Sequence, residues 1–260
     1  MYRHHKDAIE KATEKLRSQE NVLGVIVGGS VAHGFANENS DIDLMIVYSD
    51  EEFQNRLAIG DIAYFETDST SYEGGYIDGK ATSADFIKKV AESGSEPAKY
   101  AYKDAIVTFD RVGGLEELVR SASSYPVARK QENIEKFFAQ LQGWRWYYYE
   151  ALGRGNKYLM DVSVVNFVLF AGRLILAYNE TLYPYHKWFL RVLDSVKNKP
   201  EGLLPCMNAN IEQKKAEHVE KLFNMITGFT DWPNDKFWSV RFMLDSELDW
   251  LNGGAPVSDL

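Results

Sequence analysis

Hydrophobic residues follow different patterns in the two halves of the chain. Before about residue 110 they form short apolar runs rich in β-branched residues, which are typical of buried strands. After about residue 129 they recur at the spacing of buried or amphipathic helices. The patterns predict strands at 22–28, 41–48, 61–67, 72–79 and 105–109, helices at 4–20, 83–93 and 115–122, and further helices at 129–152, 157–179, 184–197, 210–228 and 234–252.

A stretch rich in serine, with a proline, separates the two patterns at residues 121–126. Such a composition is typical of a linker. Strands early in a chain and helices late indicate an α+β domain followed by a helical bundle. We therefore expect two domains, at residues 1–124 and 125–260.

Two aspartates stand two residues apart in the second predicted strand. Side chains alternate along a strand, so Asp41 and Asp43 should share one face while Ile42 points to the other. Neighbouring carboxylates repel each other, and a hard divalent cation such as Mg²⁺ compensates for that repulsion. Two such ions roughly 3.5–4 Å apart can activate a hydroxyl and stabilise the leaving pyrophosphate. Alternatively, an acidic strand start simply faces water.

The turn Gly28-Gly29-Ser30 ends the first predicted strand. Two glycines allow the backbone to approach a charged ligand closely, because no Cβ intervenes. Ser30 adds a hydroxyl group and begins a short helical turn whose N–H groups favour an anion. The turn is therefore a candidate phosphate site.

Together these residues give the spacing Gly29-Ser30-x10-Asp41-x-Asp43. It resembles the signature of the DNA polymerase β-like nucleotidyltransferase superfamily. Within that superfamily, it is most similar to the small bacterial antibiotic nucleotidyltransferases of the aminoglycoside and lincosamide types. The resemblance covers about residues 22–48.

The resemblance implies a mixed sheet with helices on one face in a catalytic domain, and a helical substrate-binding domain after it. It also implies Mg²⁺-dependent transfer of a nucleoside monophosphate from a nucleoside triphosphate, with ATP the expected one, to a hydroxyl of a small molecule. By this likeness Gly29 and Ser30, with Gly28, would hold the triphosphate. Asp41 and Asp43 would bind two metal ions.

Such enzymes generally carry a third carboxylate on a later strand. Our candidate is Asp78, either as a metal ligand or as the base that takes the acceptor's proton. The alternative is a turn at Asp78-Gly79, because Asp-Gly is a strong hairpin signal. Three other acidic residues are held in reserve: Glu66, Glu73 and Asp85, the last of which falls in the capped first turn of a predicted helix.

The helical half has a second cluster, around residues 173–188. Pro184 is expected to start a helix with Lys187 in its first turn. A lysine there opposes the helix dipole and needs a partner, either the triphosphate or an acidic side chain. Arg173 lies in an apolar helix, where an ion pair between domains would compensate for its burial. The aromatic stretch 144–149 is expected to pack between helices or at a dimer contact.

Composition narrows the class of protein. One cysteine, Cys206, allows no internal disulfide, and the N-terminus has no secretory h-region, so we expect a cytoplasmic enzyme. The richest apolar segment, residues 162–176, contains Asn166 and Arg173, which favours a buried helix over a membrane span. The net charge of −9 argues against nonspecific nucleic-acid binding.

Three functions remain open from the sequence. The first is a small-molecule nucleotidyltransferase, possible also as a homodimer. The second is a nucleotidyltransferase-type antitoxin, in which the domain modifies or binds a partner protein. The third is a catalytically idle nucleotide sensor, which the presence of all three candidate carboxylates does not support.

Overall fold

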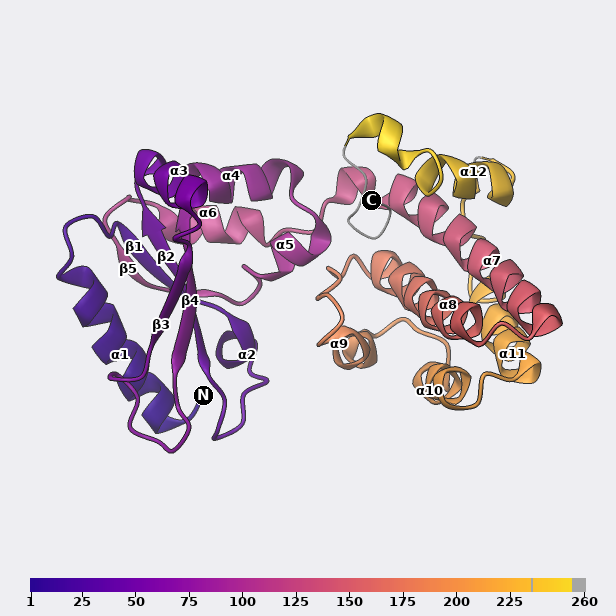
Figure 1. Ribbon diagram of the computed structural model, residues 1–260, viewed down its shortest axis with the longest axis horizontal. Coiled ribbons are helices and arrows are strands. Elements are labelled where there is room, and N and C mark those ends of the chain that lie inside the picture. The colour runs from indigo at the N-terminus through magenta and orange to yellow at the C-terminus, as the bar shows by residue number, and fades with distance from the viewer. Residues whose placement is uncertain (235, 254–260) are drawn as a thin grey trace. The chain divides into compact units, whose positions relative to one another are not determined.

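The computed structural model describes residues 1–234 and 236–253. The chain divides into two compact units, Met1–Tyr125 and Pro126–Leu260. This division lies one residue after the position suggested by the linker composition. The first unit contains all the strands of the described chain, and the second is helical (Figure 1). The α+β fold class is thus confirmed.

The first unit is built on a five-stranded mixed sheet of strand order β3-β4-β2-β1-β5. β2 and β4 run parallel, and the other neighbouring strands are antiparallel. Parallel neighbours need a crossover, which α3 (Asp50–Ile59) and β3 provide here. The strands are β1 (Gly24–Val27), β2 (Ile42–Tyr48), β3 (Ala63–Glu66), β4 (Ile77–Ser83) and β5 (Ile106–Asp110).

Helices cover both faces of this sheet, whereas the resemblance implied helices on one face only. The apolar stripe of α1 (Arg3–Arg17) packs on one face, where Ile42 and Leu44 are fully buried. α4 (Ala84–Ser93) and α6 (Leu115–Ala122) pack on the other face, against Met45 and Val47. β2 therefore contributes to two cores through its alternating side chains.

Two helices of the first unit were not predicted. α3 has one buried residue, Phe53, so it shows almost no apolar period. Its start is nevertheless fixed by Ser49, whose side chain accepts a hydrogen bond from the Glu52 N–H, and its end by Gly60 in the left-handed conformation. α5 (Glu96–Tyr100) is a short helix capped by Ser95. The fourth strand also begins later than expected, at Ile77, because a turn occupies the residues before it.

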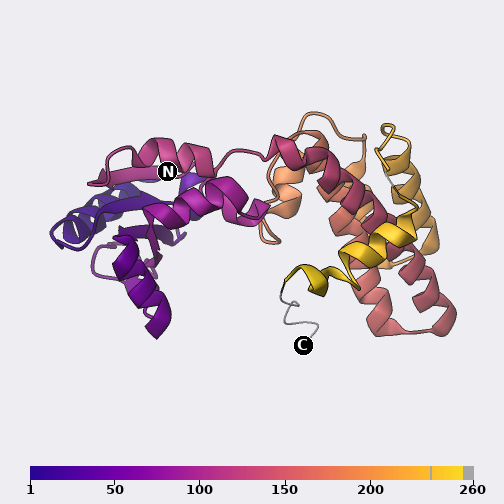
Figure 2. The same ribbon diagram turned by 90° about the horizontal axis from the view of Figure 1, so that it is seen from above.

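The second unit is a helical bundle centred on two long helices. α7 (Lys130–Arg154) and α8 (Lys157–Tyr178) are joined by a tight turn in which Gly155 is left-handed. Both views show the two helices side by side (Figures 1 and 2). Around them lie η1 (Val127–Arg129), α9 (Phe189–Ser195), α10 (Leu203–Gln213), α11 (Ala216–Thr227), α12 (Trp238–Asp245) and η2 (Asp249–Asn252).

Three predicted helices of this unit have different bounds in the structure. The segment 184–197 becomes helical only at Phe189, after an extended stretch with a left-handed Tyr185. The segment 210–228 is divided between α10 and α11, because Lys214 takes the left-handed conformation. Among the described residues of the segment 234–252, those in an α-helix belong to α12.

α8 is long and apolar enough to cross a membrane by length and composition alone. Half of its most apolar window is buried inside the unit. Its buried side chains include Phe167, Leu174 and Ile175, which are fully enclosed. This burial is that of a core helix, as the polar residues within it had indicated.

Candidate active site

The register between β2 and β4 places Asp43 directly opposite Asp78. Because the strands are parallel neighbours, residues in register point to the same face of the sheet. Their neighbours Ile42 and Ile77 are fully buried on the α1 face, so Asp43 and Asp78 face the other way. Asp41, two residues before Asp43, shares that side by alternation. The register thus brings all three predicted carboxylates to one face, where the two strands begin.

The glycine turn is hydrogen-bonded to β2 at Asp43. The Gly28 N–H donates a hydrogen bond of 2.9 Å to the Asp43 carbonyl oxygen. Gly29 follows with a φ of 60°, and a Cβ on it would overlap the Asp43 carboxylate. Glycine is therefore required at position 29 for two reasons, its backbone conformation and its contact with Asp43.

Ser30 occupies the start of the short helix α2 (Gly29–Ala32). It is only 7% exposed, and its Oγ has no hydrogen-bond partner among the described residues. Leaving a buried hydroxyl unsatisfied costs about 1–3 kcal/mol. A ligand oxygen at this turn would satisfy it.

Tyr76, which was not predicted as a site residue, lies beside Asp41 on this face of the sheet. The Tyr76 hydroxyl donates a 3.1 Å hydrogen bond to Asp41 Oδ2, and this bond to a carboxylate raises the pKa of Tyr76 above its ordinary value. The Tyr76 ring also lies beside that of Phe65, with centroids 5.6 Å apart. Residues 76 and 78 have the same strand parity, which is the sequence signal that would have placed Tyr76 beside the aspartates.

The three carboxylates lie on one face of the sheet, but their side chains are not arranged as a metal-binding site. Among residues 1–234 and 236–253, no group of three or more His, Cys, Asp and Glu side chains is arranged to hold a metal ion as it stands. Asp41 is engaged by Tyr76, and Asp43 lies against Gly29. The strand register places the candidate ligands on one face of the sheet.

The segment that contains these residues is similar to a known protein family. Residues 9–98 match the family model described as a nucleotidyltransferase domain. This segment is a nucleotidyltransferase domain of the DNA polymerase β-like superfamily. It contains the glycine turn and all three aspartates, and it makes the chain a nucleotidyltransferase.

A second family model matches the middle of the chain. Residues 99–189 match a domain of unknown function (DUF4037), which begins in the first unit and ends in the second. No curated protein matches the chain significantly. The solved structures include a nucleotidyltransferase-like protein from Exiguobacterium sibiricum 255-15 with a TM-score of 0.46 and 12% identity, over 86% of this chain and 72% of that one.

The side chains of the nucleotidyltransferase domain fit a divalent cation with a triphosphate. Asp41, Asp43 and Asp78 offer hard oxygen ligands of the kind that Mg²⁺ prefers. The unsatisfied Ser30 hydroxyl offers a donor for a phosphate oxygen, and Gly29 places the backbone of the turn directly against the Asp43 carboxylate. Proteins of this family generally use a nucleoside triphosphate and a divalent metal.

The alternatives to Asp78 are placed elsewhere in the nucleotidyltransferase domain. Asp78 and Gly79 both lie inside β4, so the interpretation of Asp78-Gly79 as a turn is wrong. Glu66 pairs with Ile77 in the register and points to the opposite, α1 face. Asp85 lies in the first turn of α4, after the end of β4. Glu73 lies in the loop that precedes β4.

Glu66 has a structural role instead. It is buried, forms an ion pair with Lys15 and accepts a 2.6 Å hydrogen bond from the Ser69 hydroxyl. Burial by itself would raise the pKa of Glu66, but the hydrogen bonds from Lys15 and Ser69 outweigh it and hold the pKa below its usual range.

Two residues of the second unit were singled out from the sequence. Lys187 is exposed and lies in the turn before α9, not in the first turn of a helix, so the helix-dipole argument for it is wrong. Its Nζ is 5.1 Å from the centroid of the Trp188 ring. The Arg173 guanidinium lies over two rings, 4.2 Å from the Phe137 centroid and 4.4 Å from that of Tyr183. These rings stabilise the arginine in its apolar surroundings.

Proposed function

We propose that the chain transfers a nucleoside monophosphate from a nucleoside triphosphate, ATP by preference, to a hydroxyl of a small molecule, with release of pyrophosphate. One observation carries this proposal: Asp43 is opposite Asp78 in the β2–β4 register and against Gly29 of the glycine turn. The carboxylates and the glycine turn thereby occupy the same end of the sheet.

Each residue has a role in this proposal. The Ser30 hydroxyl and the backbone at Gly28 and Gly29 hold the β- and γ-phosphates, while Asp41, Asp43 and Asp78 hold two Mg²⁺ ions. When bound, Mg²⁺ supplies charge neutralisation for the triphosphate and the leaving pyrophosphate. Tyr76 keeps Asp41 in place by its hydrogen bond. Catalysis then consists mainly of positioning.

Asp78 is also positioned to act as the general base that takes the proton of the acceptor hydroxyl. It is exposed, so an acceptor hydroxyl can approach it. Its carboxylate would accept the proton as the hydroxyl oxygen attacks the α-phosphorus and the bond to pyrophosphate breaks. A group within hydrogen-bond reach of the acceptor serves this purpose better than bulk water.

We propose further that the helical unit binds the acceptor, which by the resemblance is a small antibiotic of the aminoglycoside or lincosamide type. On this view the enzyme is cytoplasmic, acts on soluble substrates and engages neither membranes nor nucleic acid nonspecifically. Lys187 as a triphosphate contact and a homodimeric state stay predictions.

The test is pyrophosphate release measured with a panel of triphosphates and hydroxyl acceptors, with and without Mg²⁺. Asp43→Asn should lower kcat on the order of 10³-fold, because it removes a charge that must balance the metal and phosphates. The matched control is Asp7→Asn, which changes an exposed aspartate on α1 and should leave the rate unchanged.

Three outcomes decide between the possibilities. Wild-type activity in Asp43→Asn would overturn the assigned site. A protein band labelled by ATP carrying ³²P at the α-phosphate, with no small-molecule product, would favour the antitoxin alternative. Activity that survives removal of divalent ions by EDTA would contradict the proposed Mg²⁺ requirement.

A further inference from the structure

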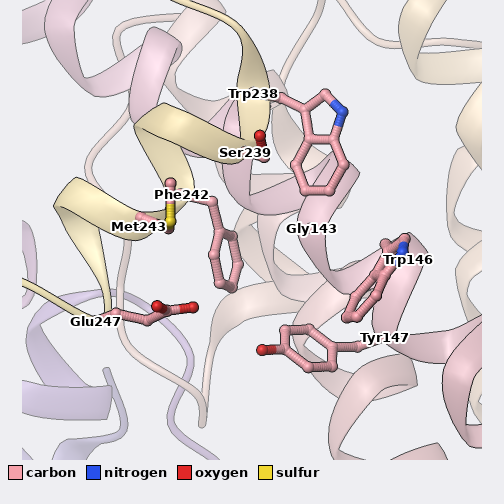
Figure 3. A pocket seen from close by; sticks show the side chains of 8 residues that line it. All are labelled: Gly143, Trp146, Tyr147, Trp238, Ser239, Phe242, Met243 and Glu247. Carbon is pink, nitrogen blue, oxygen red and sulfur yellow. The ribbon is translucent and has the colours of Figure 1, made fainter.

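A cavity of about 350 Å³ lies between α7 and α12 in the helical unit (Figure 3). Its size falls within the range of small-molecule sites, about 300–1,000 Å³. Aromatic rings form most of its wall, and the principal lining residues are Trp146, Tyr147, Trp238, Phe242, Met243 and Glu247.

The wall is held in place by packing between the two helices. Gly143 of α7 has no side chain at the point where Phe242 of α12 approaches, and a Cβ there would overlap the Phe242 ring. The Phe242 ring lies 5.9 Å from that of Tyr147. The side-chain amide of Gln140 also donates a 2.8 Å hydrogen bond to the Ser246 hydroxyl, just after α12. The rings therefore form a preformed surface.

Trp146 extends this surface toward solvent. It is 48% exposed, and its ring lies edge-on to Tyr147 with centroids 5.0 Å apart. Trp238 lies across the cavity from it, on α12 (Figure 3). A large indole ring left half-exposed beside a cavity is a surface on which a ligand can be placed.

Among the described residues, the cavity is lined by one charged side chain, and its charge is negative. Glu247 is the charged residue among those that line it, and in Figure 3 its carboxylate and the Tyr147 hydroxyl turn toward each other. The arginine of α12, Arg241, forms a 2.7 Å ion pair with Asp245 and is not among the residues that line the cavity. The faces of aromatic rings are also negative. The potential inside the cavity consequently favours a positive ligand.

We propose that this pocket binds an organic cation, such as an alkylated ammonium group, between the aromatic rings and the Glu247 carboxylate. The rings attract the cation through their faces, and the carboxylate neutralises it. A neutral molecule of the same shape gains only apolar burial, and an anion is repelled. This inference concerns the helical unit by itself and does not depend on the nucleotidyl-transfer proposal.

Choline and 3,3-dimethylbutan-1-ol test the proposal, since they share a shape and differ in charge. Binding is followed by the indole N–H signals of the six tryptophans in ¹H–¹⁵N spectra of the full chain, with Trp146 and Trp238 assigned by phenylalanine substitution. Choline should shift these two signals saturably. The neutral alcohol should bind at least tenfold more weakly, as expected when ring faces and a carboxylate recognise charge.

Two substitutions localise the effect. Glu247→Gln should weaken choline binding about threefold, in keeping with an exposed charge pair, and Trp146→Leu about fivefold. The matched control is Glu212→Gln, which removes the same charge from an exposed site on α10. It should leave binding unchanged.

Equal binding of choline and the neutral alcohol would overturn the proposal, because the pocket would then recognise shape alone. Equal losses in Glu247→Gln and Glu212→Gln would also overturn it, because they would reflect only the net charge of −9. Shifts confined to tryptophans other than 146 and 238 would place the cation elsewhere.

Discussion

Glu66 on β3 and Asp78 on β4 lie one register position apart, and yet they belong to opposite faces of the same sheet. On the α1 face Glu66 is buried and bonded to Lys15 and Ser69. On the other face Asp78 is exposed and opposite Asp43. The comparison shows that strand parity decides whether a carboxylate stabilises the fold or is presented to a ligand. Five substitutions, one of them a matched control, test this division and the site on the Asp78 face, beginning with the largest expected effect.

Gly29→Ala should remove nearly all activity, with kcat reduced on the order of 10²-fold or more. The new Cβ would displace the Asp43 carboxylate, and a non-glycine residue at a φ of 60° is strained as well. Pyrophosphate release measures the first effect and urea unfolding the second.

Gly60→Ala is the matched control for Gly29→Ala. Gly60 also has a positive φ, of 77°, but a Cβ there meets nothing within 4 Å. It should cost about 1 kcal/mol of unfolding free energy and leave kcat unchanged. Equal activity losses in the two variants would show that the contact between Gly29 and Asp43 is unimportant.

Glu66→Gln should lower the free energy of unfolding by about 1–2 kcal/mol at pH 7, because it weakens the bonds to Lys15 and Ser69. The pKa of Glu66 is depressed in the folded state, so its stabilisation is present above the ordinary glutamate pKa of about 4.3. That stabilisation is lost as pH falls through the folded-state pKa. Urea unfolding curves between pH 3 and 7 should therefore converge for the two proteins at the acid end.

Asp78→Asn provides the reciprocal comparison. An exposed substitution should change stability by no more than about 0.5 kcal/mol, while activity falls strongly. Glu66→Gln should show the opposite combination, with stability lost and activity kept when assayed well below the unfolding transition. If the two variants behaved alike, the contrast between the faces would be wrong.

Tyr76→Phe has the smallest expected effect. It removes the hydroxyl that holds Asp41 and keeps the ring beside Phe65. The loss of one hydrogen bond of about 0.5–1.5 kcal/mol should reduce kcat by roughly two- to tenfold without destabilising the fold. A rise in the Mg²⁺ concentration needed for half-maximal activity would show that the bond positions Asp41. An unchanged rate and Mg²⁺ dependence would mean that Tyr76 only packs.

Much of the first unit follows from local patterns. The apolar stripe of α1, the alternation in β2 and the Ser83 cap of α4 each depend on neighbouring residues, and each element lies where the pattern indicated. α3 was missed because its contact with the core rests on Phe53 alone. The start of α9 was placed too early because Pro184 permits a helix start without requiring one.

In the candidate site, too, some features follow from the local sequence and others from the tertiary structure. The sequence alone determined the glycine turn and the shared face of Asp41 and Asp43, because backbone conformation and strand alternation are local properties. Only the tertiary structure decided that Asp78 pairs with Asp43, that Glu66 turns away and that Tyr76 reaches Asp41. Those relations depend on which strands pair and in which register, and the contact between Tyr76 and Asp41 joins residues more than thirty positions apart in the sequence.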